Sequence, residues 1–196
     1  MTEIPRNENV NEYRNRLLDG MAASIAERGY GATTIADIVR EAGVSRRTFY
    51  EHFDGRADCL IALHDGTSEA ALRVLQGAID PMHDWQVQVE QALAAYLGAL
   101  ACNPVLLRTL FLDLPGLGAP GLAARRRAHQ AIADFMLKTV NDEHENMALS
   151  PDMAVAAVGG IHELVLQAIE RDQVAALTEL ATSAARLVRA AVTKPA

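Results

Sequence analysis

The chain has 196 residues, of which half are hydrophobic and 5% are aromatic. This length can form one large or two small buried cores, and the hydrophobic content excludes a disordered chain. Alanine, the best helix former, occurs 35 times, so the composition predicts an all-α protein. The net charge of -7 does not exclude nucleic-acid binding, because binding depends on a local patch.

The cysteines and the hydropathy indicate the compartment. Cys59 and Cys102 match no CxxC pattern, which is typical of free thiols in a reducing compartment. The first 14 residues lack the apolar segment of a signal peptide. The most apolar stretch, residues 153–169, contains His162 and Glu163 and is marginal in length for a membrane span. We therefore expect a cytoplasmic protein without a membrane partner.

Apolar residues recur at helical spacing along almost the whole chain. Residues 1–9 are polar, and we expect them to form a disordered tail. Glycine and proline residues punctuate the remainder, with Gly29 placed to end the first helix. The pattern predicts about nine helices, over residues 10–28, 34–42, 46–53, 56–79, 84–102, 105–114, 120–145, 151–171 and 175–192.

Residues 34–53 have the pattern of a helix-turn-helix. Thr34 and Asp37 fit a capping box at the start of one short helix. Gly43 supplies the unusual dihedral angles of a tight turn, and Ser45 can cap the next helix. The sequence therefore predicts two short helices that meet at a steep angle.

The helix that follows Ser45 presents a polar face. Phe49 and Phe53, four residues apart, suit its inner side. Arginine can bridge guanine O6 and N7, and hydroxyl or imidazole groups can bond phosphates and base edges. This pattern predicts a major-groove reader, with an outer face formed by Arg46, Arg47, Thr48, Tyr50 and His52.

Residues 34–60, TIADIVREAGVSRRTFYEHFDGRADCL, resemble the DNA-binding signature of TetR-family transcriptional regulators, and the likeness covers residues 10–63. The resemblance implies that Thr34 binds a phosphate and that Arg56, where the family usually has lysine, binds another. It also implies that Ala36 faces the bases, where a methyl group can contact only thymine. The candidate DNA-binding residues are thus Thr34, Ala36, Ser45, Arg46, Arg47, Thr48, Tyr50, His52 and Arg56.

The resemblance divides the chain into a DNA-binding domain at residues 10–55 and a helical effector-binding and dimerisation domain at residues 56–196. We expect a small apolar or amphipathic effector among the helices of the second domain. Ordinary core packing is an equally good interpretation for each aromatic candidate. The candidate effector-binding residues are Trp85, Tyr96, Arg108, Phe111, His129, His162 and Glu163.

Two observations favour a homodimer. Residues 40–56 contain four arginines and three acidic residues, so one copy would bind DNA weakly, whereas two copies can occupy half-sites about one DNA turn apart. Residues 153–169 are apolar nearly all round, which a surface helix of a monomer rarely is. The candidate interface, from this helix and the last one, is Val158, Gly159, Ile161, Val165, Leu180, Ala184, Leu187 and Val188.

No catalytic arrangement is visible in the sequence. The six histidines show no HxxxH or HExxH spacing, so we expect no metal, no cofactor and no enzymatic activity. The sequence predicts a regulator, usually a repressor, that leaves a palindromic double-stranded operator when an effector binds. Two alternatives stay open: a DNA-binding dimer controlled by a protein partner, and a helical binding domain without DNA affinity.

Overall fold

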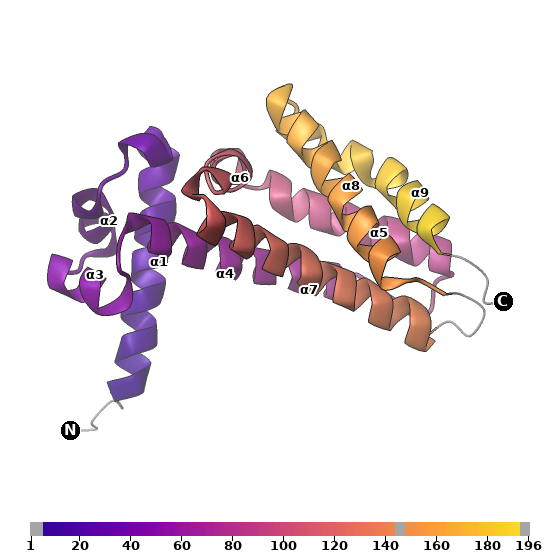
Figure 1. Cartoon of the computed structure of the whole chain (residues 1–196), viewed down its shortest axis with the longest axis horizontal. Coiled ribbons are helices and arrows are strands. Elements are labelled where there is room, and N and C mark those ends of the chain that lie inside the picture. The colour runs from indigo at the N-terminus through magenta and orange to yellow at the C-terminus, as the bar shows by residue number, and fades with distance from the viewer. Residues whose placement is uncertain (1–5, 144–147, 193–196) are drawn as a thin grey trace. The chain divides into compact units, whose positions relative to one another are not determined.

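The computed structural model describes residues 6–143 and 148–192, and it confirms the all-α prediction. Figure 1 shows the helices in chain order. The described residues form nine α-helices and two 3-10 segments: α1 (Arg6–Ala32), α2 (Ile35–Ala42), α3 (Arg46–His52), α4 (Arg56–Gly77), α5 (Trp85–Ala101), α6 (Pro104–Leu112), η1 (Pro115–Leu117), α7 (Ala119–Glu143), α8 (Pro151–Glu170), η2 (Val174–Leu180) and α9 (Ala181–Ala191).

Most helix boundaries lie within two residues of the predicted ones, and three differences affect the architecture. Helix α1 begins at Arg6, inside the stretch predicted as a tail, of which residues 1–5 lie outside the described residues. Gly29 breaks α1 as expected, with φ 75°, but a short helical turn continues to Ala32. The predicted last helix opens as the 3-10 segment η2 before α9 begins at Ala181, because apolar periodicity does not distinguish a 3-10 turn from an α-helical one.

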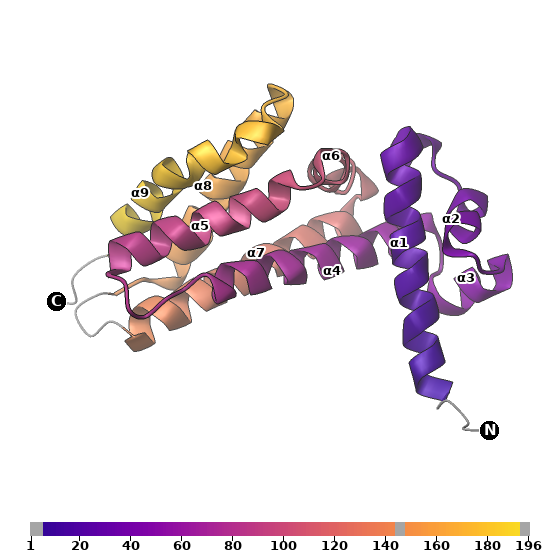
Figure 2. The same cartoon turned by 180° about the vertical axis from the view of Figure 1, so that it is seen from behind.

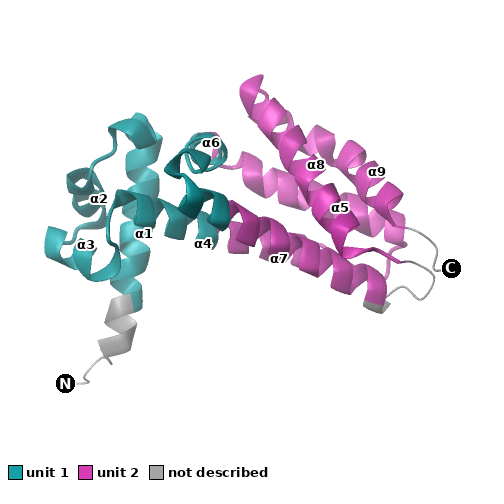
Figure 3. Cartoon of the chain, viewed as in Figure 1, with its two compact units in different colours: residues 1–66, 105–124 teal, residues 67–104, 125–196 magenta. Residues whose placement is uncertain are grey.

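The chain divides into two compact units, coloured in Figure 3. Unit 1 comprises residues 1–66 and 105–124, and unit 2 comprises residues 67–104 and 125–196. Helices α4 and α7 each run from one unit into the other, whereas α1, α2 and α3 lie wholly in unit 1. The candidate interface on α3 therefore depends on the packing of unit 1.

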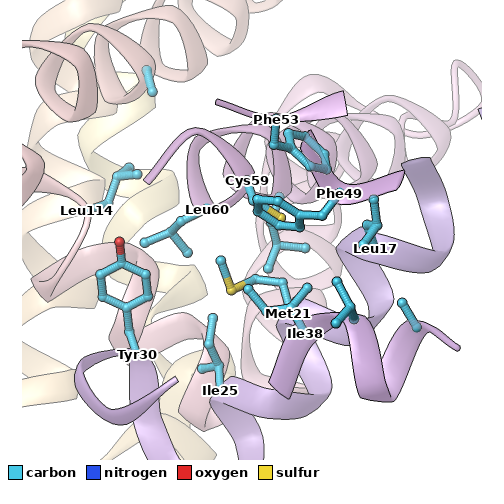
Figure 4. Close-up of a cluster of buried hydrophobic side chains, with 14 residues drawn as sticks. Leu17, Met21, Ile25, Tyr30, Ile38, Phe49, Phe53, Cys59, Leu60 and Leu114 are labelled. Atoms are coloured by element: carbon cyan, nitrogen blue, oxygen red, sulfur yellow. The ribbon is translucent and has the colours of Figure 1, made fainter. Parts of the chain in front are cut away.

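Unit 1 has a core of large apolar side chains, shown in Figure 4. Phe49 of α3 is fully buried among residues of α1, α2 and α4, including Met21 and Leu60. Helices α1 and α2 approach closely at Gly20, where an added Cβ atom would lie 2.6 Å from the Ile38 carbonyl oxygen. The absence of a side chain at Gly20 thus lets α1 support α2 directly.

Unit 2 is a helical bundle in which α5, α8 and α9 lie side by side in both views (Figures 1 and 2). Val89 and Leu93 of α5 pack with Ile161 of α8 and with Ala185 of α9. A second cluster joins α7, α8 and α9 and includes Ala133. The buried faces of these helices are rich in alanine and valine, which permits short distances between helix axes.

Helix α8 is also the most apolar helix of the bundle. Among the described residues, α8 is long and apolar enough to cross a membrane. The bent pair formed by α5 with α6 and η1 meets the same length and composition criterion when it is counted as one span. Core helices of globular proteins satisfy the same criterion. Seven residues of α8 are buried within the chain, so internal packing accounts for its apolar character.

Candidate nucleic-acid interface

Helix α2 begins with a complete capping box. The Thr34 hydroxyl accepts a hydrogen bond from the Asp37 backbone N–H at 3.2 Å and donates one to Asp37 Oδ2 at 2.6 Å. The Thr34 backbone N–H donates to the same carboxylate at 3.0 Å. The capping box predicted from the sequence is therefore present, and it fixes the exposed Thr34 at the first turn of the motif.

Asp37 is also the centre of a small ionic network. Its Oδ1 atom lies 3.2 Å from Arg28 Nη1 and 3.0 Å from Arg40 Nη1. The hydrogen bonds from Thr34, together with the two guanidinium groups, lower the pKa of Asp37 to about 2. This carboxylate thus stays ionised and keeps the start of α2 attached to α1 at neutral pH.

The turn between α2 and α3 depends on one glycine and one arginine. Gly43 has φ 62° and ψ 38°, the left-handed region that favours glycine. Arg16 of α1 donates from Nε and Nη2 to the Ala42 carbonyl at 3.0 and 2.7 Å, and from Nη2 to the Gly43 carbonyl at 2.9 Å. The sequence interpretation found Gly43 but missed Arg16; the unmet carbonyls at the end of α2, which favour a nearby cation, were the available signal.

Helix α3 is held at its start and along its inner face. The Ser45 hydroxyl accepts from the Thr48 backbone N–H at 3.0 Å, and Phe49 and Phe53 are buried. The opposite face is open: Arg46 and Arg47 are exposed, and Tyr50 is 54% exposed. Local capping and two inward aromatic rings therefore present two guanidinium groups and a phenol to solvent.

The other candidate DNA contacts occupy varied surroundings. Ala36 is exposed on α2, whereas Thr48 and His52 are half-buried on α3. The Thr48 hydroxyl lies 2.9 Å from the Ser45 hydroxyl, so part of its hydrogen-bonding capacity is used inside the helix. The structure thus places the α3 candidates on one short segment.

Arg56, the predicted phosphate contact at the start of α4, also makes contacts within the chain. Its Nη1 atom donates to the carbonyls of Tyr30, at 3.0 Å, and of Thr33. Its guanidinium carbon also lies 4.4 Å from the centroid of the Tyr30 ring. Arg56 therefore connects the start of α4 to the end of α1. Its partner Tyr30 lies 26 residues earlier in the sequence.

The predicted effector-binding residues do not form one cluster within either unit. Arg108 and Phe111 belong to unit 1, and the others belong to unit 2. His129 and His162 do meet, with Nε2 of one ring 3.1 Å from Nδ1 of the other. Trp85 packs against the unit 2 core.

The two remaining effector candidates differ in exposure. Burial raises the pKa of Tyr96 to about 12, which keeps its phenol neutral. Glu163 is exposed and accepts a hydrogen bond from Gln167 at 3.1 Å. No group of three or more histidine, cysteine, aspartate or glutamate residues in the described parts of the chain could hold a metal ion.

The candidate dimer interface needs a correction. Its residues lie mainly on the inner faces of α8 and α9. The sequence of an apolar helix does not show which side faces the core, so the prediction did not separate inner from outer residues. Gly159, Leu180 and Leu187 are partly exposed. The remaining candidates are buried inside their own chain and are not available to a partner: Val158, Ile161, Val165, Ala184 and Val188.

The fold and the α2–α3 motif define a helix-turn-helix protein with a C-terminal helical bundle. Residues 17–63 match the family model described as bacterial regulatory proteins, tetR family. The TetR-family resemblance is thereby confirmed: residues 17–63 carry the sequence of its N-terminal domain.

Similar proteins support the same assignment over different lengths. The regulator TtgR of Pseudomonas putida is 36% identical over 62 residues, which cover 32% of this chain and only 30% of TtgR. A TetR-family regulator from Pectobacterium atrosepticum superimposes with a TM-score of 0.74 at 22% identity, over 98% and 100% of the two chains. FadR from Bacillus subtilis, solved in complex with stearoyl-CoA, gives 0.69 at 20% identity over 89% and 96%. The chain therefore has this fold along nearly its whole length.

Proposed function

We propose that this protein is a sequence-specific DNA-binding transcriptional regulator whose α3 helix enters the major groove. The observation that carries the proposal is the exposed face of α3, where Arg46, Arg47 and Tyr50 project from a helix fixed by Ser45 and Phe49. A rigid helix that presents guanidinium groups can form bidentate bonds with guanine. The role is regulatory rather than catalytic.

We propose that the active form is a homodimer on a palindromic operator. Residues 40–56 carry a formal charge of only +1, from four arginines and three acidic residues, and two copies double the phosphate contacts. Two α3 helices would then occupy half-sites about 34–36 Å apart. The proposed dimer surface is the exposed side of α8, where Val155 is 44% exposed and nothing lies within 4 Å of a Cβ atom built on Gly159.

We further propose that a small apolar or amphipathic effector releases the operator. FadR from Bacillus subtilis binds stearoyl-CoA, and a helical bundle of the same fold is the candidate effector domain here. Helix α4 contains residues of both units, and Leu60 and Leu63 near its start belong to the core around α1. To switch the operator from mostly bound to mostly free, the effector needs a preference of about 5 kcal/mol for one state.

Selection of bound sites from random DNA tests the proposal. We expect a symmetric site, and we expect Arg46→Ala and Arg47→Ala each to weaken binding to it by about 5- to 150-fold, the range for one base contact. Arg126→Ala, which removes an exposed arginine of α7 outside the motif, is the matched control and should leave binding unchanged. Unaltered affinity after both α3 substitutions would exclude the α3 mechanism.

Two further measurements separate the alternatives. For every phosphate contacted, the logarithm of the DNA-binding constant should fall by about 0.9 with each tenfold rise in salt concentration. A binding constant that does not change with salt would therefore contradict a DNA-binding dimer. A thermal-shift screen with long-chain acyl compounds tests the effector. A regulator controlled by a protein partner would bind the operator but show no stabilising compound.

A further inference from the structure

Helix α3 carries one acidic side chain, Glu51, on a segment that otherwise presents arginine, tyrosine and histidine. The Glu51 side chain is 55% exposed, and that of its neighbour Arg47 is 89% exposed. A carboxylate at a DNA-facing helix repels phosphate and lowers affinity for every sequence. Its presence there is therefore expected only if it contributes something other than affinity.

The geometry of the pair indicates that contribution. Arg47 Nε lies 3.1 Å from Glu51 Oε1, one helical turn away. This bond uses the nitrogen nearest the aliphatic chain, so the end of the guanidinium group, with Nη1 and Nη2, is not part of it. A guanine is read through two parallel N–H donors of this kind.

Arg40 of α2 offers a contrast within the same domain. All three of its guanidinium nitrogens are engaged, Nε and Nη2 with Glu41 and Nη1 with Asp37. Arg40 is thus held as a structural cation, whereas Arg47 is held through one nitrogen only. The ion pair with Glu51 restricts the rotation of the Arg47 side chain and leaves the Nη1 and Nη2 atoms of Arg47 able to donate to a base.

We propose that Glu51 is a positioning residue for sequence recognition: it orients Arg47 toward a guanine, while its repulsion of phosphate lowers affinity for every sequence alike. The inference rests on the proposed DNA-binding function. In solution an exposed pair of this type stabilises the helix little. Its effect is expected on the bound state, where a side chain already in one rotamer loses less conformational entropy on contact with the base.

The test compares four variants on a full set of duplexes. The duplexes are the selected operator, every single-base-pair change of it and an unrelated sequence, at one salt concentration. Arg47→Ala identifies the base pair that Arg47 reads. Glu51→Ala removes both charge and acceptor, Glu51→Gln keeps an acceptor without the charge, and Glu41→Gln is the matched control for loss of one negative charge.

We expect Glu51→Ala to reduce discrimination at the Arg47 base pair by about 3- to 10-fold, part of the range for one base contact. Glu51→Gln should retain most of that discrimination. Both changes should raise affinity for the unrelated duplex, whereas Glu41→Gln should leave discrimination at every position as in the unmodified protein. Circular dichroism and thermal unfolding check that each variant stays folded.

Other outcomes overturn the inference in distinguishable ways. If the unmodified protein shows no sequence preference, the proposed function and the role of Glu51 both fail. If Arg47→Ala relaxes one position and Glu51→Ala does not, the role of Glu51 alone is wrong. The same holds if Glu51→Ala relaxes a different base pair, since Glu51 would then read a base itself, or if Arg47→Ala weakens all duplexes equally.

Discussion

The two units bury side chains of different size. Among the described residues, the aromatic side chains that are buried most completely all belong to unit 1: Tyr30, Phe49 and Phe53. Unit 2 buries leucine, isoleucine and valine with many small residues. Its buried alanines are Ala71, Ala92, Ala133, Ala154, Ala157, Ala168, Ala181, Ala184, Ala185 and Ala191.

The size of the buried side chains affects how narrowly the helix positions in each unit are determined. A large aromatic ring fits one arrangement of neighbours, so Phe49 fixes the position of α3 and hence of the arginines opposite it. Alanine allows helices to approach closely but restricts their relative rotation less. We therefore expect the aromatic core of unit 1 to hold α3 more rigidly than the alanine-rich core of unit 2 holds its helices.

The largest effect is expected from Phe49→Ala. Phe49 is fully buried, and its truncation should lower the free energy of unfolding by about 3–5 kcal/mol. Trp85, the one tryptophan of the chain, belongs to unit 2, so its fluorescence reports that unit, while circular dichroism reports both. We expect the circular dichroism transition to shift more than the Trp85 transition.

Tyr50→Ala is the matched control for this substitution, because Tyr50 is adjacent in sequence and 54% exposed. It should leave stability nearly unchanged and reduce operator binding. Equal destabilisation by the two substitutions would show that α3 does not depend on its inner face. A Trp85 transition that shifts as far as the circular dichroism transition would show that the two cores unfold together.

Two glycines at helix contacts, one in each unit, differ in what an added Cβ atom would meet. A Cβ atom at Gly20 would lie 2.6 Å from the Ile38 carbonyl oxygen, which is backbone, whereas at Gly160 it would meet the end of the Leu187 side chain at 2.7 Å. Gly20→Ala should cost about 1–3 kcal/mol, as overpacking does. In Gly160→Ala the Leu187 side chain can move, so chemical denaturation should show a much smaller loss.

Gly66→Ala is the control for the intrinsic effect of the substitution. Nothing lies within 4 Å of a Cβ atom at Gly66, inside α4, and alanine should stabilise that helix by about 0.5–1 kcal/mol. If Gly160→Ala proves as costly as Gly20→Ala, the contact between α8 and α9 is as rigid as that between α1 and α2.

The parts of the structure that the sequence predicted are those determined by neighbouring residues. Thr34, Gly43 and Ser45 cap helices through partners within four residues of themselves, so their roles follow from the local sequence pattern. The contacts of Arg16 with Gly43 and of Arg56 with Tyr30 span 26 or 27 residues. The unmet carbonyls at the end of α2 indicate that a nearby cation is favoured, but the local sequence does not show which arginine supplies it.

The misplaced dimer residues have a related cause. Helix α8 is apolar on several faces, and the sequence does not show which face packs against α5 and α9. Ile161 therefore looked like an interface residue, although it is buried in the unit 2 core. In unit 1 the single pair Phe49 and Phe53 was enough to distinguish the inner side of α3 from the outer one.

A serine caps the start of one helix in each unit. The Ser45 hydroxyl accepts from Thr48 N at 3.0 Å at the start of α3, and Ser150 accepts from Met153 N at 3.3 Å at the start of α8. Each change to alanine should cost about 0.5–2 kcal/mol. The loss should be larger for Ser45→Ala because α3 has seven residues and α8 has 20. Thermal unfolding measures both, and a larger loss at Ser150 would contradict the dependence on helix length.

The last prediction concerns the acid dependence of stability, to which Asp37 contributes. Its folded-state pKa, about 2, is below the ordinary value of 3.8, so the folded chain binds this proton less readily than the unfolded chain. The resulting stabilisation is complete above about pH 4 and is lost as the pH falls toward 2. Urea unfolding between pH 5 and 2 should show unit 1 losing stability over this range.

Asp37→Asn should remove this part of the acid dependence, because the amide does not ionise. Asp152→Asn, in the first turn of α8, is the control for removal of one negative charge and should leave the acid profile of unit 1 unchanged. The Asp37 network connects the start of α2 to Arg28 of α1, so Asp37→Asn should also weaken operator binding at neutral pH. An Asp37→Asn protein with the unaltered acid profile would show that this carboxylate does not hold α2 in place.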